Sequence, residues 1–408
     1  MKSYIVNGSV MVTNLPAEAK AKWAKYSDAK TPEEKLRALQ EFLSAIPKHK
    51  GTENLVYWVK RRMAELREEV EERKSRKIGG GGPSFFIEKE GAAQAIILGM
   101  PSSGKSSILS MLTNAKPQIS DTPFTTKFPV PGMLRYEDIQ FQLVEVPAIV
   151  KGISEGAIWW GSRVLGIARN ADALIIVVDL SNNPTHQLDV IINELSKAGI
   201  YTVRPKGYAV IERSKAYQRV SVVNLGKLVN CTADDVRKLL ESYRIYNALV
   251  KIYGEVTLED VERSLFENVV YKPTIILANK ADLYDTATLN TVLSEIKAKS
   301  TSIPVIATSA KTGYGLSEVS VNLFRVLNLI RIYAKEPNNE SPSPRPLILK
   351  DGATLLDAIK HLRSELLQYF KYAKIWGPSA KYPGERVGLD HKLMDGDVIE
   401  VHTRIKAI

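Results

Sequence analysis

Gly99-Met100-Pro101-Ser102-Ser103-Gly104-Lys105-Ser106 is the stretch that decides the fold. It has the spacing Gly-x-x-x-x-Gly-Lys-Ser/Thr, follows the apolar run Ala95–Leu98 and opens the helical run Ile108–Leu112. A strand, a glycine-bounded loop and a helix in this order are typical of a phosphate-binding loop, because backbone amides and the helix N-terminus direct partial positive charge at phosphate oxygens. The sequence therefore predicts a nucleotide site in an α/β protein.

Two residues of this loop have the most specific expected roles. Lys105 is expected to reach the β- and γ-phosphates, and the Ser106 hydroxyl is expected to bind Mg²⁺. The predicted phosphate contacts come from the loop and the first helical turn: Gly99, Pro101, Ser102, Ser103, Gly104, Lys105, Ser106 and Ser107.

Two further motifs indicate which base is bound. Asn279-Lys280-Ala281-Asp282 follows the apolar run Thr274–Ala278, and Ser309-Ala310-Lys311 follows Val305–Thr308. A carboxylate such as Asp282 accepts two hydrogen bonds from the ring N–H and exocyclic amine of guanine, whereas adenine offers no such pair of donors on that edge. The sequence therefore predicts GTP rather than ATP, with Asn279, Lys280, Asp282, Ser309, Ala310 and Lys311 around the base.

Short apolar runs alternate with helical stretches from about residue 92 onward. The predicted strands are Ala95–Leu98, Phe141–Val146, Ala173–Asp179, Thr274–Ala278 and Val305–Thr308. Strands that alternate with helices favour a parallel α/β sheet.

Composition is that of an ordinary globular protein. The 408 residues are 44% hydrophobic and 25% charged, and the apolar runs are far shorter than the roughly 18 residues that a membrane-spanning helix needs. The single cysteine, Cys231, cannot form an internal disulfide, which favours a reducing cytoplasm. The formal charge of +11 favours a polyanionic partner without selecting one.

The first 78 residues are predicted to form two basic helices joined by a short turn. Thr31-Pro32-Glu33-Glu34 is typical of a helix start, and the apolar residues that follow, up to Ile46, recur every three or four positions. A second helix is expected over Asn54–Arg76. This segment holds 17 Lys and Arg against 11 Asp and Glu, more than half of the excess positive charge. Gly79–Pro83 then interrupts regular structure as a flexible linker.

Three other stretches resemble a known family. Asp121–Gly132, with the sequence DTPFTTKFPVPG, resembles the first switch of Obg-related GTPases, and more narrowly that of the developmentally regulated GTP-binding (DRG) proteins and their archaeal relatives. Phe370–Gly377 and Arg386–His391 are similar to the TGS domain of that family. The resemblance covers nearly the whole chain. It implies that Thr126 binds Mg²⁺ together with Ser106 and senses the γ-phosphate.

The resemblance also implies an order of domains. We expect a helical hairpin domain (1–78), a glycine-rich linker (79–91), a P-loop GTPase domain with a parallel sheet (92–336), a second linker (337–344) and a β-grasp TGS domain (345–408). A small α+β insert is expected at 200–272, with strands over Tyr201–Val223 and a helix over Ala233–Val250.

The second switch departs from the Asp-x-Pro-Gly pattern of the family, since it is Glu145-Val146-Pro147-Ala148-Ile149. Glu145 keeps the carboxylate but is one methylene longer, which shifts a water-mediated contact to Mg²⁺. Ala148 replaces a glycine whose backbone N–H reaches the γ-phosphate and whose torsional freedom alanine lacks. Ile149 stands where many small GTPases place a water-orienting glutamine, although relatives in this family also use a hydrophobic residue.

With these changes the catalytic candidates are Lys105, Thr126 and Glu145. Our hypothesis is that the protein hydrolyses GTP slowly or needs a partner, the alternative being an adjusted backbone with ordinary activity. Ser102 stands where many related GTPases place an asparagine that helps to bind K⁺. DRG proteins also tend to have serine there, so K⁺ stays a candidate second cation that this sequence does not decide.

The C-terminal segment interleaves aromatic rings with cations. These residues are Tyr369, Phe370, Lys371, Tyr372, Lys374, Trp376, Lys381 and Tyr382. Rings and cations together are typical of surfaces that hold single-stranded RNA, and the same rings are equally expected in the core of a small domain.

Two functions from different classes follow. The first is a cytoplasmic, Mg²⁺-dependent GTPase that acts as a switch on ribosomes or RNA in translation. An accessory protein is a candidate partner, and neither DNA specificity nor a membrane is expected. The second is a GTP-dependent binding adaptor with negligible hydrolysis, favoured by Glu145 and Ala148.

Overall fold

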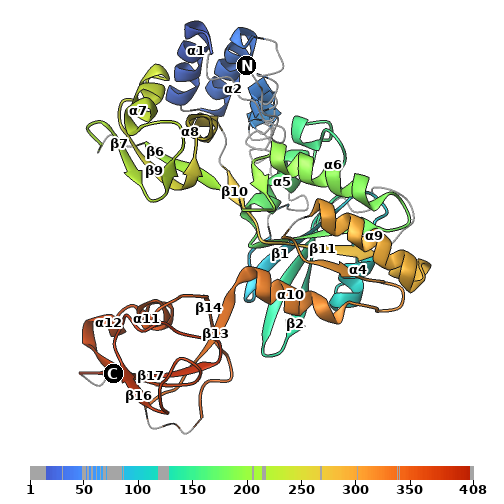
Figure 1. Cartoon of the computed structure of the whole chain (residues 1–408), viewed down its shortest axis with the longest axis vertical. Helices are drawn as coiled ribbons and strands as arrows, with labels where there is room; N and C mark the ends of the chain where they lie inside the picture. The colour runs from blue at the N-terminus through green and yellow to red at the C-terminus, as the bar shows by residue number, and fades with distance from the viewer. Residues whose placement is uncertain are drawn as a thin grey trace.

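The computed structural model describes most of the chain (Figure 1). The described residues are 15–29, 31–47, 52, 55, 56, 58–60, 62–64, 66, 67, 70, 85, 87–117, 128–204, 206–213, 217–266, 269–300, 302–337, 339 and 341–404.

A six-stranded sheet, in the order β12-β11-β4-β1-β3-β2, carries the predicted phosphate loop. Its strands are β1 (Ala93–Gly99), β2 (Val130–Tyr136), β3 (Ile139–Glu145), β4 (Ala173–Asp179), β11 (Thr274–Asn279) and β12 (Val305–Ala307). All neighbouring pairs in this sheet are parallel except the antiparallel pair of β2 and β3. The prediction of a parallel α/β sheet is confirmed, apart from this antiparallel edge.

Helices cover both faces of this sheet, so that β1, β4 and β11 are buried at every residue. The helices α4 (Lys105–Leu112) and α10 (Ser317–Leu327) pack on one face. The other face is covered by α5 (Gly161–Asn170), α6 (Pro184–Lys197) and α9 (Thr286–Lys299). Two short 3₁₀ turns, η2 (Ile153–Glu155) and η3 (Ala281–Leu283), follow β3 and β11.

Strand β2 was not predicted, because Pro131 and Gly132 are both depleted in strands. An edge strand tolerates them, since one side of its backbone needs no partner in the sheet. Gly132 is also required by close packing: a Cβ there would lie 2.4 Å from Thr113 Oγ1.

The N-terminal helices begin and end at recognisable signals. α1 (Ala17–Asp28) follows Pro16, and α2 (Pro32–Ala45) follows Thr31. The Glu34 N–H donates to Thr31 Oγ1 at 3.2 Å and the Glu34 carboxylate accepts from the Thr31 N–H, as the predicted helix start requires. The helix α1 was not predicted. The described residues from 55 to 70 are helical, and the rest of the predicted helix Asn54–Arg76 lies outside the described residues, as does the linker Gly79–Pro83.

The insert between α6 and β11 is an α+β unit on a two-stranded stalk. The stalk pairs β5 (Ile200–Tyr201) with β10 (Val270–Tyr271). Its larger sheet has the order β6-β9-β7, with β8 paired to β9. The elements are β6 (Gly207–Arg213), β7 (Val220–Asn224), β8 (Lys227–Leu228), α7 (Ala233–Ser242), β9 (Ala248–Val256) and α8 (Leu258–Phe266). The predicted helix Ala233–Val250 is too long, since it ends at Ser242 and Ala248 already starts β9.

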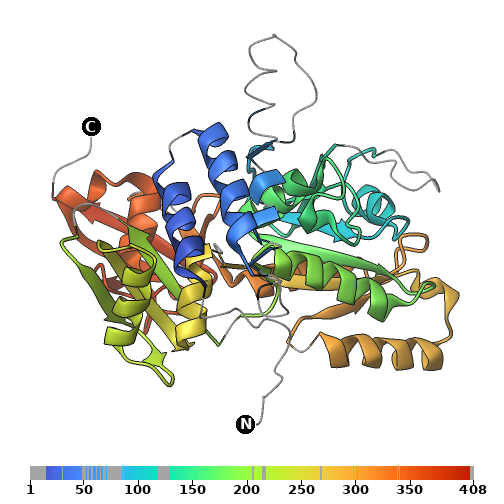
Figure 2. The same cartoon turned by 90° about the horizontal axis from the view of Figure 1, so that it is seen from above.

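The N-terminal helices and the insert share one hydrophobic core. The helices therefore do not form the separate domain that was expected for 1–78. Trp23, Phe42 and Trp58 pack in the same cluster as Val236 and Leu240 of α7. Figures 1 and 2 show α1 and α2 beside the helices of the insert. At this contact the Lys20 ammonium donates to Ser242 Oγ at 3.1 Å. We call this joint unit the helix–insert body.

The C-terminal unit contains a five-stranded sheet in the order β14-β13-β17-β15-β16. The helix α11 packs on this sheet, and its apolar residues are part of the hydrophobic core of the unit. Its elements are β13 (Leu329–Ala334), β14 (Leu347–Lys350), α11 (Leu355–Arg363), α12 (Leu366–Tyr369), β15 (Phe370–Trp376), β16 (Glu385–Val387) and β17 (Asp397–Thr403). The expected boundary differs, because β13 was assigned to the GTPase domain ending at 336 and instead pairs with β17. Among the described residues no helix has the length and apolar character to span a membrane.

Candidate nucleotide-binding site

The predicted phosphate loop lies between the end of β1 and the start of α4. Gly104 precedes α4 with φ +89°, and a Cβ at this position would lie 2.2 Å from the Asn279 amide nitrogen. Both its backbone angle and its close approach to Asn279 therefore require glycine. Ser102 also has a positive φ of 60°. The loop is thus held in a shape that few sequences adopt, with the N-terminus of α4 facing its centre.

Lys105 is enclosed in this loop. Its side chain is buried, and its ammonium donates to the Met100 carbonyl at 2.9 Å. Burial lowers the pKa of Lys105 to about 8, although the Glu145 carboxylate nearby raises it. A buried cation with so little compensation favours an anionic ligand, which would restore the charge stabilisation that water provides for an exposed lysine.

Glu145 and Ser106 meet beside Lys105. The Ser106 hydroxyl donates to Glu145 Oε1 at 2.5 Å, and the Glu145 side chain is 1% exposed at the end of β3. The longer side chain therefore still reaches the hydroxyl that is predicted to bind Mg²⁺. Carboxylate and hydroxyl oxygens are ligands that Mg²⁺ accepts in proteins, so this pair fits the ion.

The predicted base loops are tied to the phosphate loop by Asn279. Its amide nitrogen donates to the Ser103 carbonyl at 3.1 Å, and its amide oxygen accepts from the Ala310 N–H at 3.1 Å. Lys280, with φ 69°, pairs with Asp179 at 2.6 Å. Three loops from β1, β11 and β12 are thereby fixed to one another at the carboxyl edge of the sheet, where ligands of such folds bind.

Asp282 and Ser309 form the part of the site predicted to bind the base. The Ser309 hydroxyl donates to Asp282 Oδ1 at 2.6 Å, which orients an otherwise exposed carboxylate. The structure brings together all predicted nucleotide residues of the loops at 99–107, 279–282 and 309–311. Of these residues, Lys311 has an exposed side chain. Thr126, predicted to sense the γ-phosphate, lies outside the described residues.

The second switch packs tightly against the phosphate loop. The Ile149 N–H donates to the Gly99 carbonyl at 3.0 Å, and the Ile149 side chain is fully buried in the core under α5 and α6. Ala148 is 5% exposed. In this arrangement neither side chain offers a polar group that could orient a water molecule.

Tyr372 and Trp376 of the C-terminal sheet lie on its outer face, whereas Phe370 packs against the core, as one of the two expectations for the rings requires. Tyr372 stacks on His402 with ring centroids 4.6 Å apart, and the Arg386 guanidinium lies 4.7 Å from the centre of the Tyr372 ring. Ala373 and Ile375, which alternate with these rings along β15, fill the core instead. Of the two expectations for Tyr372 and Trp376, a place in the core is therefore wrong, and RNA contact stays a prediction.

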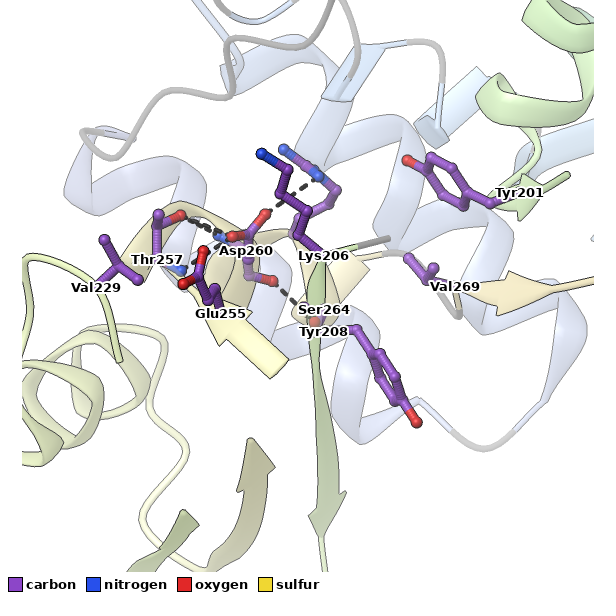
Figure 3. Close-up of a pocket in the computed structure, with 11 residues that line it drawn as sticks. Tyr201, Lys206, Tyr208, Val229, Glu255, Thr257, Asp260, Ser264 and Val269 are labelled. Atoms are coloured by element: carbon purple, nitrogen blue, oxygen red, sulfur yellow. Dashed lines mark hydrogen bonds and ion pairs between the residues drawn. The ribbon is translucent and has the colours of Figure 1, made fainter. Parts of the chain in front are cut away.

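A separate hollow of about 290 Å³ lies at the root of the insert (Figure 3). Asp260 on its wall accepts from the Thr257 N–H at 2.9 Å and pairs with Arg263 at 3.3 Å. The Asp260 carboxylate is used in starting α8 and in the pair with Arg263, so we assign no ligand to this hollow.

Sequence reasoning missed Asp179, the partner of Lys280. Its signal was present, since it is a carboxylate at the end of the otherwise apolar strand β4. Such a residue at the carboxyl edge of a parallel sheet is a candidate for the site.

Family models match three segments of the chain. Residues 94–210 match a family described as 50S ribosome-binding GTPase, 218–329 match the C-terminal region of the MMR_HSR1 domain, and 330–403 match the TGS domain. A GTP-binding protein of Methanocaldococcus jannaschii, named as uncharacterized, is 34% identical over 369 residues, which are 90% of this chain and 92% of that relative. The chain belongs to the developmentally regulated GTP-binding protein family.

Other DRG-family relatives align over the same span. Developmentally-regulated GTP-binding protein 1 of Xenopus laevis is 29% identical and is matched over 90% of this chain and 98% of its own. Ribosome-interacting GTPase 1 of Saccharomyces cerevisiae is 29% identical over 91% of this chain and 99% of its own. Among solved structures, the G domain of the T. maritima FeoB iron transporter aligns with 17% identity and a TM-score of 0.30, over 57% of this chain and 98% of that one. The sequence relatives identify the chain as a GTP-binding protein of the DRG type with a C-terminal TGS domain.

Proposed function

We propose that this DRG-family protein hydrolyses GTP to GDP and phosphate and acts as a switch on ribosomes in the cytoplasm. The observation that carries the proposal is the bridge made by Asn279, which holds the phosphate loop and the 309–311 loop in one frame. A frame of this kind positions a guanine base and a triphosphate at a fixed separation. Positioning and electrostatic stabilisation provide most of the catalysis in phosphoryl transfer.

In the proposed reaction Lys105 and the amides at the start of α4 offset the charge on the phosphate oxygens. Asp282 selects guanine by accepting two hydrogen bonds from its edge. Ser106 and Glu145 would hold Mg²⁺, and Thr126, outside the described residues, is the further ligand that the sequence predicts. When bound, Mg²⁺ would supply positive charge that offsets the negative charge of the phosphates.

The second switch supports slow intrinsic turnover. The side chain at 149 lies in the core, and the N–H of that residue is occupied by the Gly99 carbonyl. Attack by water on the γ-phosphate would therefore rely on backbone groups, or on a residue that a partner brings. We infer that the ribosome or an accessory protein completes the site.

Three features support the ribosome as the target. The family that matches residues 94–210 is described as ribosome-binding, and one relative is named as ribosome-interacting. The chain carries a formal charge of +11, which favours a polyanion such as ribosomal RNA. The outer face of the TGS sheet adds Lys371, Lys374 and Arg386 around its rings.

The test is steady-state GTP turnover by the pure full-length protein in Mg²⁺, with K⁺ or Na⁺, with and without ribosomes, and with ATP as the control. We expect slow multiple turnovers with GTP, none with ATP, and faster turnover with ribosomes. Equal turnover of ATP and GTP would overturn the assignment of the nucleotide. The comparison of K⁺ with Na⁺ decides whether K⁺ is a second cation.

A second function, a GTP-dependent adaptor without hydrolysis, is favoured by the same packing of Ala148 and Ile149. Sedimentation with ribosomes in GDP, GTP and a non-hydrolysable GTP analogue separates the two. Association that needs GTP while turnover stays absent under every condition would favour the adaptor over the GTPase.

A further inference from the structure

The loop that follows the second switch, residues 150–156, is fixed at several points. Gly152 and Gly156 flank the turn η2 with φ of 85° and 83°, conformations that favour glycine. Ile153 is buried in the core and Ser154 is 3% exposed. Because this loop directly continues the switch, any displacement of Glu145–Ile149 would act on it first.

A single buried carboxylate holds this loop. Glu194 of α6 is wholly buried, its Oε1 accepts from the Gly152 N–H at 3.0 Å, and its Oε2 accepts from the Ser154 N–H at 3.0 Å and the Ser154 hydroxyl at 2.5 Å. Burying a carboxylate costs free energy unless its oxygens accept such hydrogen bonds. The folded protein therefore strongly favours the state in which Glu194 keeps its hydrogen bonds to the loop.

Lys197, one turn further along α6, strengthens the same connection. Its ammonium pairs with Glu155 at 3.0 Å and lies 3.7 Å from Glu194 Oε1. The last turn of α6 is therefore attached to the loop through two carboxylates, that of Glu194 on α6 and that of Glu155 in the loop.

This last turn leads straight into the insert. After Lys197 the chain turns at Gly199, with φ 71°, and enters the stalk strand β5. The Gly199 carbonyl accepts from the Val270 N–H of β10 at 2.9 Å, so both strands of the stalk are linked to the end of α6. A shift of α6 relative to the sheet would therefore move the insert.

The loop touches the helix–insert body a second time, through the N-terminal helices. A Cβ at Gly156 would lie 3.3 Å from the Ala64 Cβ, which places the helical segment around Ala64 directly against the loop. Since that segment shares a core with the insert, both contacts of the loop end in the same body.

We propose that Glu194 is a positioning residue that couples the nucleotide site to the helix–insert body. With GTP bound, the second switch displaces loop 150–156, and the Glu194 hydrogen bonds transmit the displacement through α6 and the stalk. The proposal rests on the proposed GTP switch, but it concerns a connection that GTP binding and turnover do not themselves require.

Hydrogen exchange of the full-length protein, followed by mass spectrometry without nucleotide, with GDP and with a non-hydrolysable GTP analogue, tests this coupling. The wild type should show a difference between GDP and the analogue in peptides of α7 and α8, as well as in 145–156. In Glu194→Gln the difference at 145–149 should persist, while the difference in α7 and α8 becomes much smaller, since only the contact of Gly156 with Ala64 then joins the loop to the helix–insert body. An amide cannot replace the carboxylate, because its nitrogen would face the N–H donors.

Two further variants keep the test decisive. Ser154→Ala removes one of the three hydrogen bonds and should reduce the remote difference without abolishing it, even if Glu194→Gln folds poorly. Asp189→Asn, at an exposed position on the same helix, is the matched control and should behave as the wild type. A remote difference that keeps its wild-type size in both Glu194→Gln and Ser154→Ala, or its absence from the wild type, would overturn the coupling. Failure of the GTPase proposal would instead appear as a lack of turnover.

Discussion

Single residues at the edge of the sheet determine what the site can do. Lys105 and Glu145 are both buried, and they are connected through Ser106 at the start of α4. The motifs that contain Lys105, Asn279 and Asp282 could be predicted from the sequence because each is local and each follows an apolar strand. Glu194 could not be predicted, because its partners Gly152 and Ser154 lie 42 and 40 residues away.

The second switch gives a first prediction. The double variant Glu145→Asp, Ala148→Gly should turn over GTP about 10- to 100-fold faster than the wild type, because the torsional freedom of glycine lets the backbone N–H at 148 turn toward the γ-phosphate and stabilise its charge. Ala157→Gly, at an exposed alanine in the next loop, is the control for added backbone freedom. Turnover that does not change in the double variant would show that the backbone already adjusts around Ala148.

Lys105 gives a prediction about pH. Its pKa of about 8 in the unliganded protein lies below the value of an exposed lysine, and a bound triphosphate raises it again. Binding therefore takes up a proton above pH 8, and GTP affinity should fall by up to about tenfold per pH unit there. Titration calorimetry from about pH 7 to 9, in buffers of different ionisation enthalpy, measures both effects. An affinity independent of pH without proton uptake would contradict the burial of a charged Lys105.

At the scale of elements, signals at helix ends were more reliable than periodicity. The start of α2 was predicted from Thr31 and Pro32, whose roles depend only on neighbouring residues. α1 was missed because alanines and lysines give it little apolar periodicity. The helix expected up to Val250 was too long because the residues after Ser242 fit a strand as well as a helix, and their pairing with β6 decides the outcome.

The start of α2 gives an element-scale prediction. Thr31→Ala removes the hydroxyl that accepts from the Glu34 N–H, and should lower the free energy of unfolding of the helix–insert body by about 1 kcal/mol. Urea unfolding followed by tryptophan fluorescence measures it, since Trp23 and Trp58 lie in that core. Ser44→Ala removes an exposed hydroxyl near the end of the same helix and is the control. Equal midpoints for the two variants would contradict a stabilising cap.

At the scale of the whole molecule, the connections between units were out of reach of the sequence. The contact of Lys20 with Ser242 joins residues 222 positions apart. A similar long-range contact joins the TGS unit to the turn between β2 and β3. Arg331 of β13 pairs with Asp395 at 2.8 Å, with Asp138 at 3.3 Å and with Glu137, and the Tyr333 hydroxyl donates to Asp138 at 2.6 Å.

This contact gives a prediction about the TGS unit. Arg331→Ala should loosen the TGS sheet from the β2–β3 turn, because it removes the cation that these three carboxylates share. Exchange of backbone amides in 134–141 should become faster by about 5- to 150-fold, which corresponds to the loss of about 1 to 3 kcal/mol of local stability. Arg345 is exposed and takes no part in the contact, so Arg345→Ala serves as the control. Exchange in 134–141 that matches the control would show that the turn is stable without Arg331.

Low pH should weaken the same contact. The Arg331 guanidinium lowers the pKa of Asp395 against the opposing effect of burial. A carboxyl whose folded pKa is lowered stabilises the fold above its unfolded pKa, and this stabilisation is lost as the pH falls through the folded value. The Asp395 contribution should therefore be complete at neutral pH and disappear in strongly acidic solution. Urea unfolding of the wild type and of Arg331→Ala at a series of pH values measures it, and a difference between the two that stays constant into strong acid would contradict it.

Equilibrium binding of fluorescent GTP, ATP and XTP to the wild type and to Asp282→Asn tests the guanine nucleotide site itself. We expect the wild type to bind GTP and not ATP. We also expect Asp282→Asn to lose at least about tenfold in GTP affinity and to gain affinity for XTP, whose base carries an acceptor where guanine carries its amine. Equal binding of GTP and ATP by the wild type, or unchanged GTP affinity in Asp282→Asn, would contradict the assignment of this edge of the sheet as the guanine nucleotide site.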